Sequence, residues 1–301
     1  MNSSSEWAPR LRPGDSPGVL DIHDVSVRFG GLTALDSVSF AAAPRQVTGV
    51  IGPNGAGKTT LLNVLCGFVR PNTGKLTFGD TDLTGIRPHQ LAALGIARTL
   101  QNVGLFARLT VLENVMAGAT CHARAGFWPA LAGLGRSDRD ERTLRQRALA
   151  VLDRVGVADA ADSLPGQLPF AHRKRVALAR ALVAQPRLLL LDEPAGGLTE
   201  TELPELGQLI GNLAVEASVV VIEHRMDLMM SVCDMIAVLD FGKLIAWGTP
   251  QQVQADPAVT NAYLGAERSR EREEPEPPAD GLPGAGGDPP GPGGGSPGAA
   301  L

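Results

Sequence analysis

The stretch GPNGAGKT, residues 52–59, constrains this chain more than any other feature. It fits the pattern G-x-x-x-x-G-K-[ST], follows the apolar run QVTGVIG and leads into the helix-length segment LLNVLCGFV. In that context glycines let backbone N–H groups turn inward around a phosphate, and the helix N-terminus adds a partial positive charge. A glycine-rich turn that matched by chance would not need both flanking elements. The stretch therefore predicts a phosphate-binding loop at the edge of an α/β sheet.

Each part of this loop has an expected contact with a nucleotide. Lys58 is placed to reach the β- and γ-phosphates, and the hydroxyl of Thr59 is a ligand for Mg²⁺. We therefore predict that the chain binds ATP together with Mg²⁺. The predicted ATP-binding residues of this stretch are Gly52, Pro53, Asn54, Gly55, Ala56, Gly57, Lys58, Thr59 and Thr60.

A second motif, made of two acidic residues, follows an apolar strand. The run RLLLLDEP places Asp192 and Glu193 at the strand end, where open α/β sheets present groups that contact ligands. Asp192 can hold Mg²⁺ directly or through water, and Glu193 can orient and deprotonate an attacking water. Two adjacent carboxylates at a strand end are often only surface charge. The phosphate loop earlier in the chain makes the catalytic interpretation the favoured one.

Composition limits the classes of function. The chain has 301 residues, 44% of them hydrophobic, so it can bury a full core. Its 27 basic and 32 acidic residues give a net charge of -5, which argues against nucleic acid as a partner. Cys66, Cys121 and Cys233 lack the spacing of a zinc site or a disulfide framework. We expect neither an export signal nor a membrane span, because the longest apolar stretches are strand-sized.

Strand and helix patterns alternate along the middle of the chain. Short runs such as VLDIHDVSVRF and LDSVSFAA precede the phosphate loop, and SVVVIEH and MIAVLDFG follow the acidic motif, each typical of strands. Between them, residues from about 103 to 183 carry apolar side chains at helical spacing. We therefore predict an α/β nucleotide domain over residues 18–266, with a β-rich front end and a helical insertion. Residues 1–17 and 267–301 are polar, charged or rich in Pro and Gly, which predicts disordered tails.

Five further stretches carry a resemblance to a known family: FGGLTALDSVSF, ARTLQNVGLFARLTVLENV, DEPAGGL, IEHRMD and NAYLG. With them, residues 18–266 resemble the ATP-binding subunit of an ABC transporter, and most closely those of the branched-chain amino acid importers. The resemblance implies a P-loop NTPase core of the ABC ATPase type, with an antiparallel β subdomain and an inserted α-helical subdomain. It also implies ATP hydrolysis that powers the uptake of branched-chain amino acids, or of related amino acids or amides.

The resemblance assigns roles to three more residues. Gln101 matches the glutamine whose amide contacts Mg²⁺ and the attacking water, although a lone Gln after a strand is usually on the surface. His224 corresponds to the histidine near the γ-phosphate, with a purely structural histidine as the alternative. Phe29 falls at the position that stacks on adenine, although Phe is also an ordinary strand residue. The predicted catalytic set is therefore Glu193, His224 and Gln101, and the predicted metal set is Thr59, Gln101 and Asp192.

The stretch LPFAH, residues 168–172, aligns with the family's LSGGQ signature and departs from it. Pro169 has no hydroxyl to offer a γ-phosphate, and a hydrogen bond to a charged group contributes about 1.5 to 3 kcal/mol. Ala171 is strained if the backbone there needs a positive φ. We still predict that Ala171 and His172 contact nucleotide, because the backbone N–H groups and the helix N-terminus remain. Thr199, where the family carries Asp or Asn, is a second departure.

Related importers work as dimers in which ATP lies between the P-loop of one chain and the signature of the other. The implied partners are a second ATP-binding subunit, identical or different, transmembrane permease subunits and, through the complex, a substrate-binding protein. The implied location is the cytoplasmic face of the cell membrane. The altered signature favours one alternative, a regulatory or scaffold module that binds ATP with little turnover. The apolar stretch GFWPALAGLG, residues 126–135, is interpreted as packing within the helical subdomain, with docking to a membrane subunit as the alternative.

Overall fold

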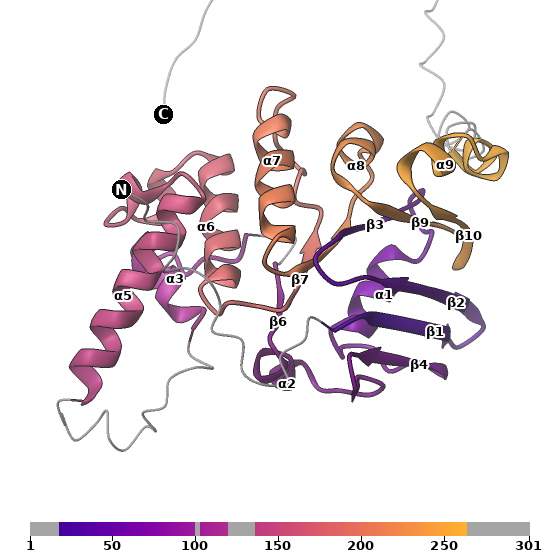
Figure 1. Cartoon of the computed structure of the whole chain (residues 1–301), viewed down its shortest axis with the longest axis horizontal. Helices are drawn as coiled ribbons and strands as arrows, with labels where there is room; N and C mark the ends of the chain where they lie inside the picture. Colours follow the sequence, from indigo (N-terminus) through magenta and orange to yellow (C-terminus); the bar gives the residue numbers. More distant parts are fainter. Residues whose placement is uncertain (1–17, 100–102, 120–135, 264–301) are drawn as a thin grey trace, which may run out of the picture.

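The structure, a computed structural model, describes three segments of the chain: residues 18–99, 103–119 and 136–263 (Figure 1). Several predictions fall outside these segments, namely those for the two tails, for Gln101 and for the apolar stretch 126–135. Among the described residues, the structure contains no helix with the length and apolar character needed to cross a membrane.

The larger of two sheets forms the centre of the molecule and has six strands in the described segments. Its spatial order is β10 (Lys243–Gly248), β9 (Met235–Asp240), β3 (Val47–Ile51), β8 (Ser218–Ile222), β7 (Leu188–Asp192) and β6 (Ile96–Arg98). Neighbouring strands run parallel except for β10, which is antiparallel to β9. Strands β3, β7 and β8 are buried at every position, which is why their sequences are continuous apolar runs rather than alternating ones.

The smaller sheet is antiparallel, and in the described part of the chain it has four strands. Their spatial order is β2 (Leu32–Ala42), β1 (Leu20–Phe29), β4 (Thr73–Phe78) and β5 (Thr81–Asp82). Helix α1 (Lys58–Leu65) lies between the two sheets (Figure 1), where its leucines share a core with apolar side chains from both. This sheet is the antiparallel β subdomain that the family resemblance implied.

Helices cover the other face of the larger sheet and form the end of the molecule opposite β1 and β2 (Figure 1). That end consists of α3 (Val111–Ala117), α5 (Arg136–Arg154) and α6 (Phe170–Leu182). The remaining helices of the described segments are α2 (Pro88–Leu91), α7 (Leu203–Ala214), α8 (Met226–Val232) and α9 (Pro250–Gln254), with short 3₁₀ turns at Ala92–Leu94, Ala158–Ala160 and Pro165–Gln167. Alternate residues of β7 separate the two cores: Leu188 and Leu190 face α1, whereas Leu189 and Leu191 face the helices.

The observed elements confirm the predicted α/β fold and sharpen its boundaries. The helix after the phosphate loop ends at Leu65, and Gly67, with φ of 70°, turns the chain well before Pro71. Helix α7 begins at Leu203, with a proline in its first turn. Strands β4 and β5 were not predicted individually, because their exposed polar residues give no apolar run.

Candidate functional site

Three neighbouring parallel strands bring the predicted site residues to one edge of the larger sheet. In their register, Val50 of β3 lies opposite Ile222 of β8, which in turn lies opposite Asp192 of β7. The segments that follow these strands therefore start side by side: the phosphate loop, the turn at Glu193 and the loop at His224. Ligand sites of open α/β sheets lie at this carboxyl edge.

The phosphate loop has a backbone shape that requires glycine. Gly52, Gly55 and Gly57 have φ values of 152°, 80° and 103°. A Cβ atom on Gly52 would lie 2.1 Å from the carbonyl oxygen of Leu239, and one on Gly57 would lie 2.7 Å from that of Ala34. At Gly55 the space is open. The loop is thus a close-fitted cradle with its backbone exposed to a ligand, as the sequence pattern predicted.

Lys58 opens α1 and is only 8% exposed. Its ammonium donates hydrogen bonds to the carbonyl oxygens of Gly52, at 2.6 Å, and Pro53, at 2.8 Å. Burial lowers the pKa of Lys58, while the charges of Glu193 and Glu223 act in the opposite direction. The strand register places the acidic motif at the same sheet edge as the phosphate loop, in line with this effect of Glu193.

Asp192 ends β7 and is held by the last residue of the neighbouring strand β6, Arg98, and by Thr99, which follows it. The Arg98 guanidinium forms an ion pair with Asp192, with 2.9 Å between Nη2 and Oδ2. The backbone N–H of Asp192 donates to the hydroxyl of Thr99 at 3.3 Å. Arg98 also lies over the ring of Phe68, 5.7 Å from its centroid. The predicted metal residue is therefore positioned by the strand that leads toward Gln101, which itself lies outside the described residues.

Glu193 begins the turn after β7 with φ of 45°, an uncommon conformation for a residue other than glycine. Its backbone N–H donates to the carbonyl oxygen of Ile222 at 2.9 Å. The ammonium of Lys174, from α6, donates to the carbonyl oxygens of Glu193, at 3.0 Å, and Pro194, at 2.9 Å. The helix behind the altered signature thus holds the turn that carries the predicted base.

His224 follows β8, and its side chain is 54% exposed at the site edge. The residue before it, Glu223, is fully buried, and its carboxylate accepts backbone N–H bonds from Ala195, His224 and Arg225. The stretch IEHRMD carries part of the family resemblance, but the sequence alone assigned no role to Glu223. The available signal was a carboxylate at the end of an apolar strand beside a predicted catalytic histidine.

Phe29 ends β1 at the tip of a hairpin and is 51% exposed. It pairs with Leu32 of β2, and Ala34 of the same strand contacts the phosphate loop. The ring is exposed, as stacking on a ligand requires. That role stays a prediction.

The altered signature forms the start of α6. Pro169 is the N-cap residue and provides no side-chain cap. Ala171 lies in the first helical turn and is not among the described residues with positive φ, so the strain considered for it does not arise. The ring of Phe170 packs against Gly197, where an added Cβ would lie 2.6 Å from a ring carbon. His172 is exposed at the same helix start, so the element keeps its shape but lacks the signature hydroxyl.

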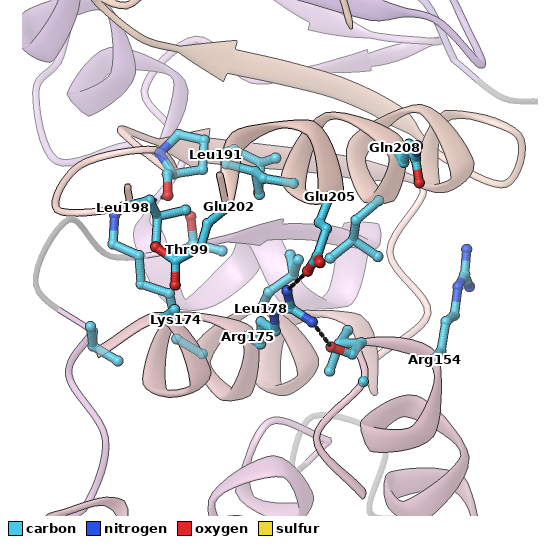
Figure 2. A pocket seen from close by; sticks show the side chains of 18 of the residues that line it. Thr99, Arg154, Lys174, Arg175, Leu178, Leu191, Leu198, Glu202, Glu205 and Gln208 are labelled. Atoms are coloured by element: carbon cyan, nitrogen blue, oxygen red, sulfur yellow. Dashed lines mark hydrogen bonds and ion pairs between the residues drawn. The ribbon is translucent and has the colours of Figure 1, made fainter. Parts of the chain in front are cut away.

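A cavity of about 270 Å³ lies between α6 and α7, next to the acidic motif (Figure 2). Lys174 and Arg175 of α6 border it, opposite Glu205 of α7. Arg175 forms an ion pair with Glu205 and donates to the carbonyl oxygen of Val155 at 3.4 Å, the two contacts that are dashed in Figure 2. These two basic residues of α6 therefore bind neighbouring elements rather than forming a solvated face.

Fold and site together define a protein that binds a nucleoside triphosphate at the carboxyl edge of a P-loop sheet. The profile of the ABC transporter family matches residues 35–196, and that of the branched-chain amino acid ATP-binding cassette transporters matches residues 243–269. The chain belongs to the ABC transporter family, in the class of ATP-binding subunits that hydrolyse ATP.

Two curated relatives match nearly their whole length. The high-affinity branched-chain amino acid transport ATP-binding protein BraF of Pseudomonas aeruginosa is 39% identical over 252 residues, which cover 82% of this chain and 98% of BraF. The high-affinity branched-chain amino acid transport ATP-binding protein LivG of Escherichia coli is 37% identical over 252 residues, which cover 83% of this chain and 99% of LivG.

Solved structures agree with the fold. The crystal structure of the ADP conformation of an ATP-binding cassette of an ABC transporter has a TM-score of 0.70 and 28% identity, covering 82% of this chain and 99% of its own. A dimeric post-hydrolysis ATP-binding cassette with ADP and Pi has a TM-score of 0.64 and 25% identity, covering 77% and 98%. The ABC ATPase fold is confirmed, while the roles of single residues stay predictions.

Proposed function

We propose that this chain is the ATP-hydrolysing subunit of an importer for branched-chain amino acids or related amino acids and amides. The observation that carries the proposal is the meeting of the phosphate loop, Asp192, Glu193 and His224 at one sheet edge. The likeness to BraF and LivG and the match at residues 243–269 support the solute class. The chain acts at the cytoplasmic face of the membrane with permease subunits, a second ATP-binding subunit and a substrate-binding protein.

Lys58 binds the terminal phosphates of ATP in this proposal. Its ammonium now donates to two neutral carbonyl oxygens of its own loop. Anionic phosphate oxygens accept stronger hydrogen bonds from an ammonium than neutral carbonyls do. Lys58 therefore exchanges these bonds for contacts with the β- and γ-phosphates, while the N-terminus of α1 faces the same phosphates.

Glu193 orients and deprotonates the water that attacks the γ-phosphoryl group. Hydrogen bonds from Lys174 and to the carbonyl oxygen of Ile222 hold the backbone of Glu193 from two sides, which fixes the point from which its carboxylate extends. His224, exposed on the adjacent loop, contacts the γ-phosphate. Gln101 completes the predicted set from outside the described residues.

Asp192 and Thr59 fit a Mg²⁺ ion because both offer the hard oxygen ligands that Mg²⁺ prefers. They lie at the end of β7 and in the first turn of α1, at the same sheet edge. When bound, the ion neutralises charge on the β- and γ-phosphates. Because Arg98 pairs with one oxygen of Asp192, we expect cation binding to weaken that ion pair.

The altered signature would give a mixed dimer two unlike sites. The phosphate loop and Glu193 of this chain face the partner's signature and form the competent site. Pro169 of this chain faces the partner's P-loop without a hydroxyl, and losing a hydrogen bond to a charged group lowers hydrolysis about ten- to a hundredfold. A homodimer of this chain hydrolyses slowly, because both of its sites use the altered loop.

A groove of about 630 Å³ supplies a docking site for a cytoplasmic segment of the permease. Phe68 and Phe106 line it and are 61% and 55% exposed. Arg98 and Arg180 lie over these rings, 5.7 Å and 5.9 Å from their centroids. A permease helix with an apolar face and an acidic side chain matches this lining. Arg98 lines this groove and also forms an ion pair with Asp192, so a permease segment that binds Arg98 would act on the predicted metal residue.

Glu193→Gln in the assembled transporter tests the proposal. We expect it to remove most of the ATPase activity and leucine uptake, and to do so more strongly than the matching change in a different partner ATPase. The control is Glu216→Gln, which removes an equal charge from a residue that pairs with Arg154 at 2.7 Å, outside the site. Equal losses from the two subunits would contradict the asymmetry, and full activity of Glu193→Gln would contradict the catalytic role.

A further inference from the structure

Glu223 is a buried carboxylate that the mechanism above does not use. Its side chain is 0% exposed, at the position directly after β8. Oε1 accepts the backbone N–H of Ala195 at 2.8 Å, and Oε2 accepts those of His224 at 2.9 Å and Arg225 at 3.3 Å. Ala195 belongs to the turn that begins at Glu193. One carboxylate therefore binds the backbone of both segments that carry predicted catalytic residues.

The location of this negative charge is unfavourable for ATP binding. The charge of Glu223 acts on both Lys58 and Lys174, the lysines nearest the phosphate loop and the acidic turn. It therefore repels an anionic triphosphate, and burial of a charge is costly unless it is fully hydrogen-bonded. A carboxylate has the advantage that both of its oxygens accept hydrogen bonds, so it can bind backbone N–H groups of two different segments.

We propose that Glu223 is a positioning residue that fixes the turn of Glu193 and the loop of His224 relative to each other. This inference rests on the proposed ATPase function. Glutamine has one acceptor oxygen and one NH₂ group, so it serves one segment and turns a donor toward the N–H groups of the other. Aspartate keeps the charge but is one methylene shorter, so it reaches only one segment. Both substitutions separate the two segments without removing a predicted catalytic group.

The test compares MgATP binding with hydrolysis in the full chain. Binding is measured by titration with MgATP, and the rate of hydrolysis by single turnover with the chain in excess over ATP. We expect Glu223→Gln to lower the rate about ten- to a hundredfold while the Kd stays equal or becomes smaller. Glu223→Asp should lower the rate with an unchanged Kd. A residue that only supported folding would instead weaken binding and the melting temperature together.

Glu200→Gln is the matched control. Glu200 pairs with Arg225 and so links the same two segments, but its side chain is 77% exposed and such pairs contribute little. We expect this variant to keep the parent rate and Kd. It makes the same change of charge at a surface bridge rather than at a buried one.

Hydrogen exchange provides a readout that does not depend on activity. In Glu223→Gln, the segment that faces the introduced NH₂ group, either residues 195–198 or residues 224–226, should exchange its amide hydrogens faster than in the parent, whereas in Glu200→Gln neither segment should change. Parent rates of hydrolysis in both Glu223 variants, or parent rates of amide exchange in both segments, would overturn the inference. If the parent chain itself binds no MgATP, the proposed function fails instead, so the two failures are distinguishable.

Discussion

Removing Arg98 should destabilise the chain far more than removing a comparable arginine at the surface. In Arg98→Met the Asp192 carboxylate loses its ion-pair partner while remaining only 7% exposed. Breaking a buried pair by deleting one member costs about 3 to 5 kcal/mol, because the remaining charge is left in a poorly solvated place. Arg98 is itself 16% exposed, so the lower end of that range, about 3 kcal/mol, applies.

The contact between the Arg98 guanidinium and the ring of Phe68 adds to this loss. A cation–π contact at a partly exposed site contributes about 0.5 to 1 kcal/mol. The expected loss in the free energy of unfolding is thus about 3.5 to 4 kcal/mol, or about 7 to 16 °C in melting temperature for a domain of this size. The matched control is Arg154→Met. Its pair with Glu216 is 2.7 Å long but 21% and 33% exposed, so the expected loss is about 0 to 1 kcal/mol.

The assay is urea unfolding of both variants with and without MgATP. If Asp192 binds the cation, MgATP should stabilise Arg98→Met more than the parent, because in the parent the cation competes with Arg98. ATP with a chelator of Mg²⁺ should stabilise both equally. A loss below about 1 kcal/mol for Arg98→Met would refute the argument that Asp192 depends on this ion pair. Equal stabilisation by MgATP would refute its role as the metal residue.

Two further predictions concern the phosphate loop and the buried thiols. Gly57→Ala should lose at least about 1 to 2 kcal/mol of stability and bind ATP more weakly, because its Cβ would meet the Ala34 carbonyl oxygen. Gly55→Ala should lose less, because the space around Gly55 is open. Denaturation measures the stability of both variants, and titration with MgATP measures their binding. Burial raises the pKa of Cys66 to about 11 and that of Cys233 to about 12, so both should resist iodoacetamide at about pH 8 until the chain unfolds, as peptide mass spectrometry would show. Above pH 9.0 the unfolded chain loses these thiol protons and the folded chain keeps them, so their contribution to the free energy of unfolding should fall as pH rises from 9.0 to about 11 for Cys66 and to about 12 for Cys233.

The features predicted from sequence share a local cause. The phosphate loop is a run of eight residues whose glycines, lysine and flanking elements can all be identified together. Asp192 and Glu193 end an apolar strand, and the parallel order of the strands then places them beside the loop. In both the phosphate loop and the acidic motif, the residues that identify the local structure and the residues that carry the chemistry lie within a few positions of each other. That is why a nucleotide site could be predicted at these residues from the sequence alone.

The contacts that position those residues were not predictable, because they join distant segments. Arg98 and Asp192 are 94 residues apart, and Glu223 and Ala195 are 28 apart. Nothing in either local pattern shows that the partners meet, and burial of Glu223 depends on the packing of β8 between β3 and β7. The strain that a positive φ would have caused at Ala171 does not occur either, because this residue is helical.

Helix α6 makes two sets of contacts, and the altered signature affects only one of them. Within the chain, Lys174 holds the turn of Glu193, and Phe170 packs on Gly197 of the following loop. These contacts are complete even though the signature glycines are absent. Pro169, at the N-terminus of the helix, provides no side-chain donor to a nucleotide on a partner. The changes therefore leave the turn of Glu193 supported, and in the proposed mixed dimer they would weaken what this chain offers to a second subunit, which is the physical basis for expecting two unequal sites.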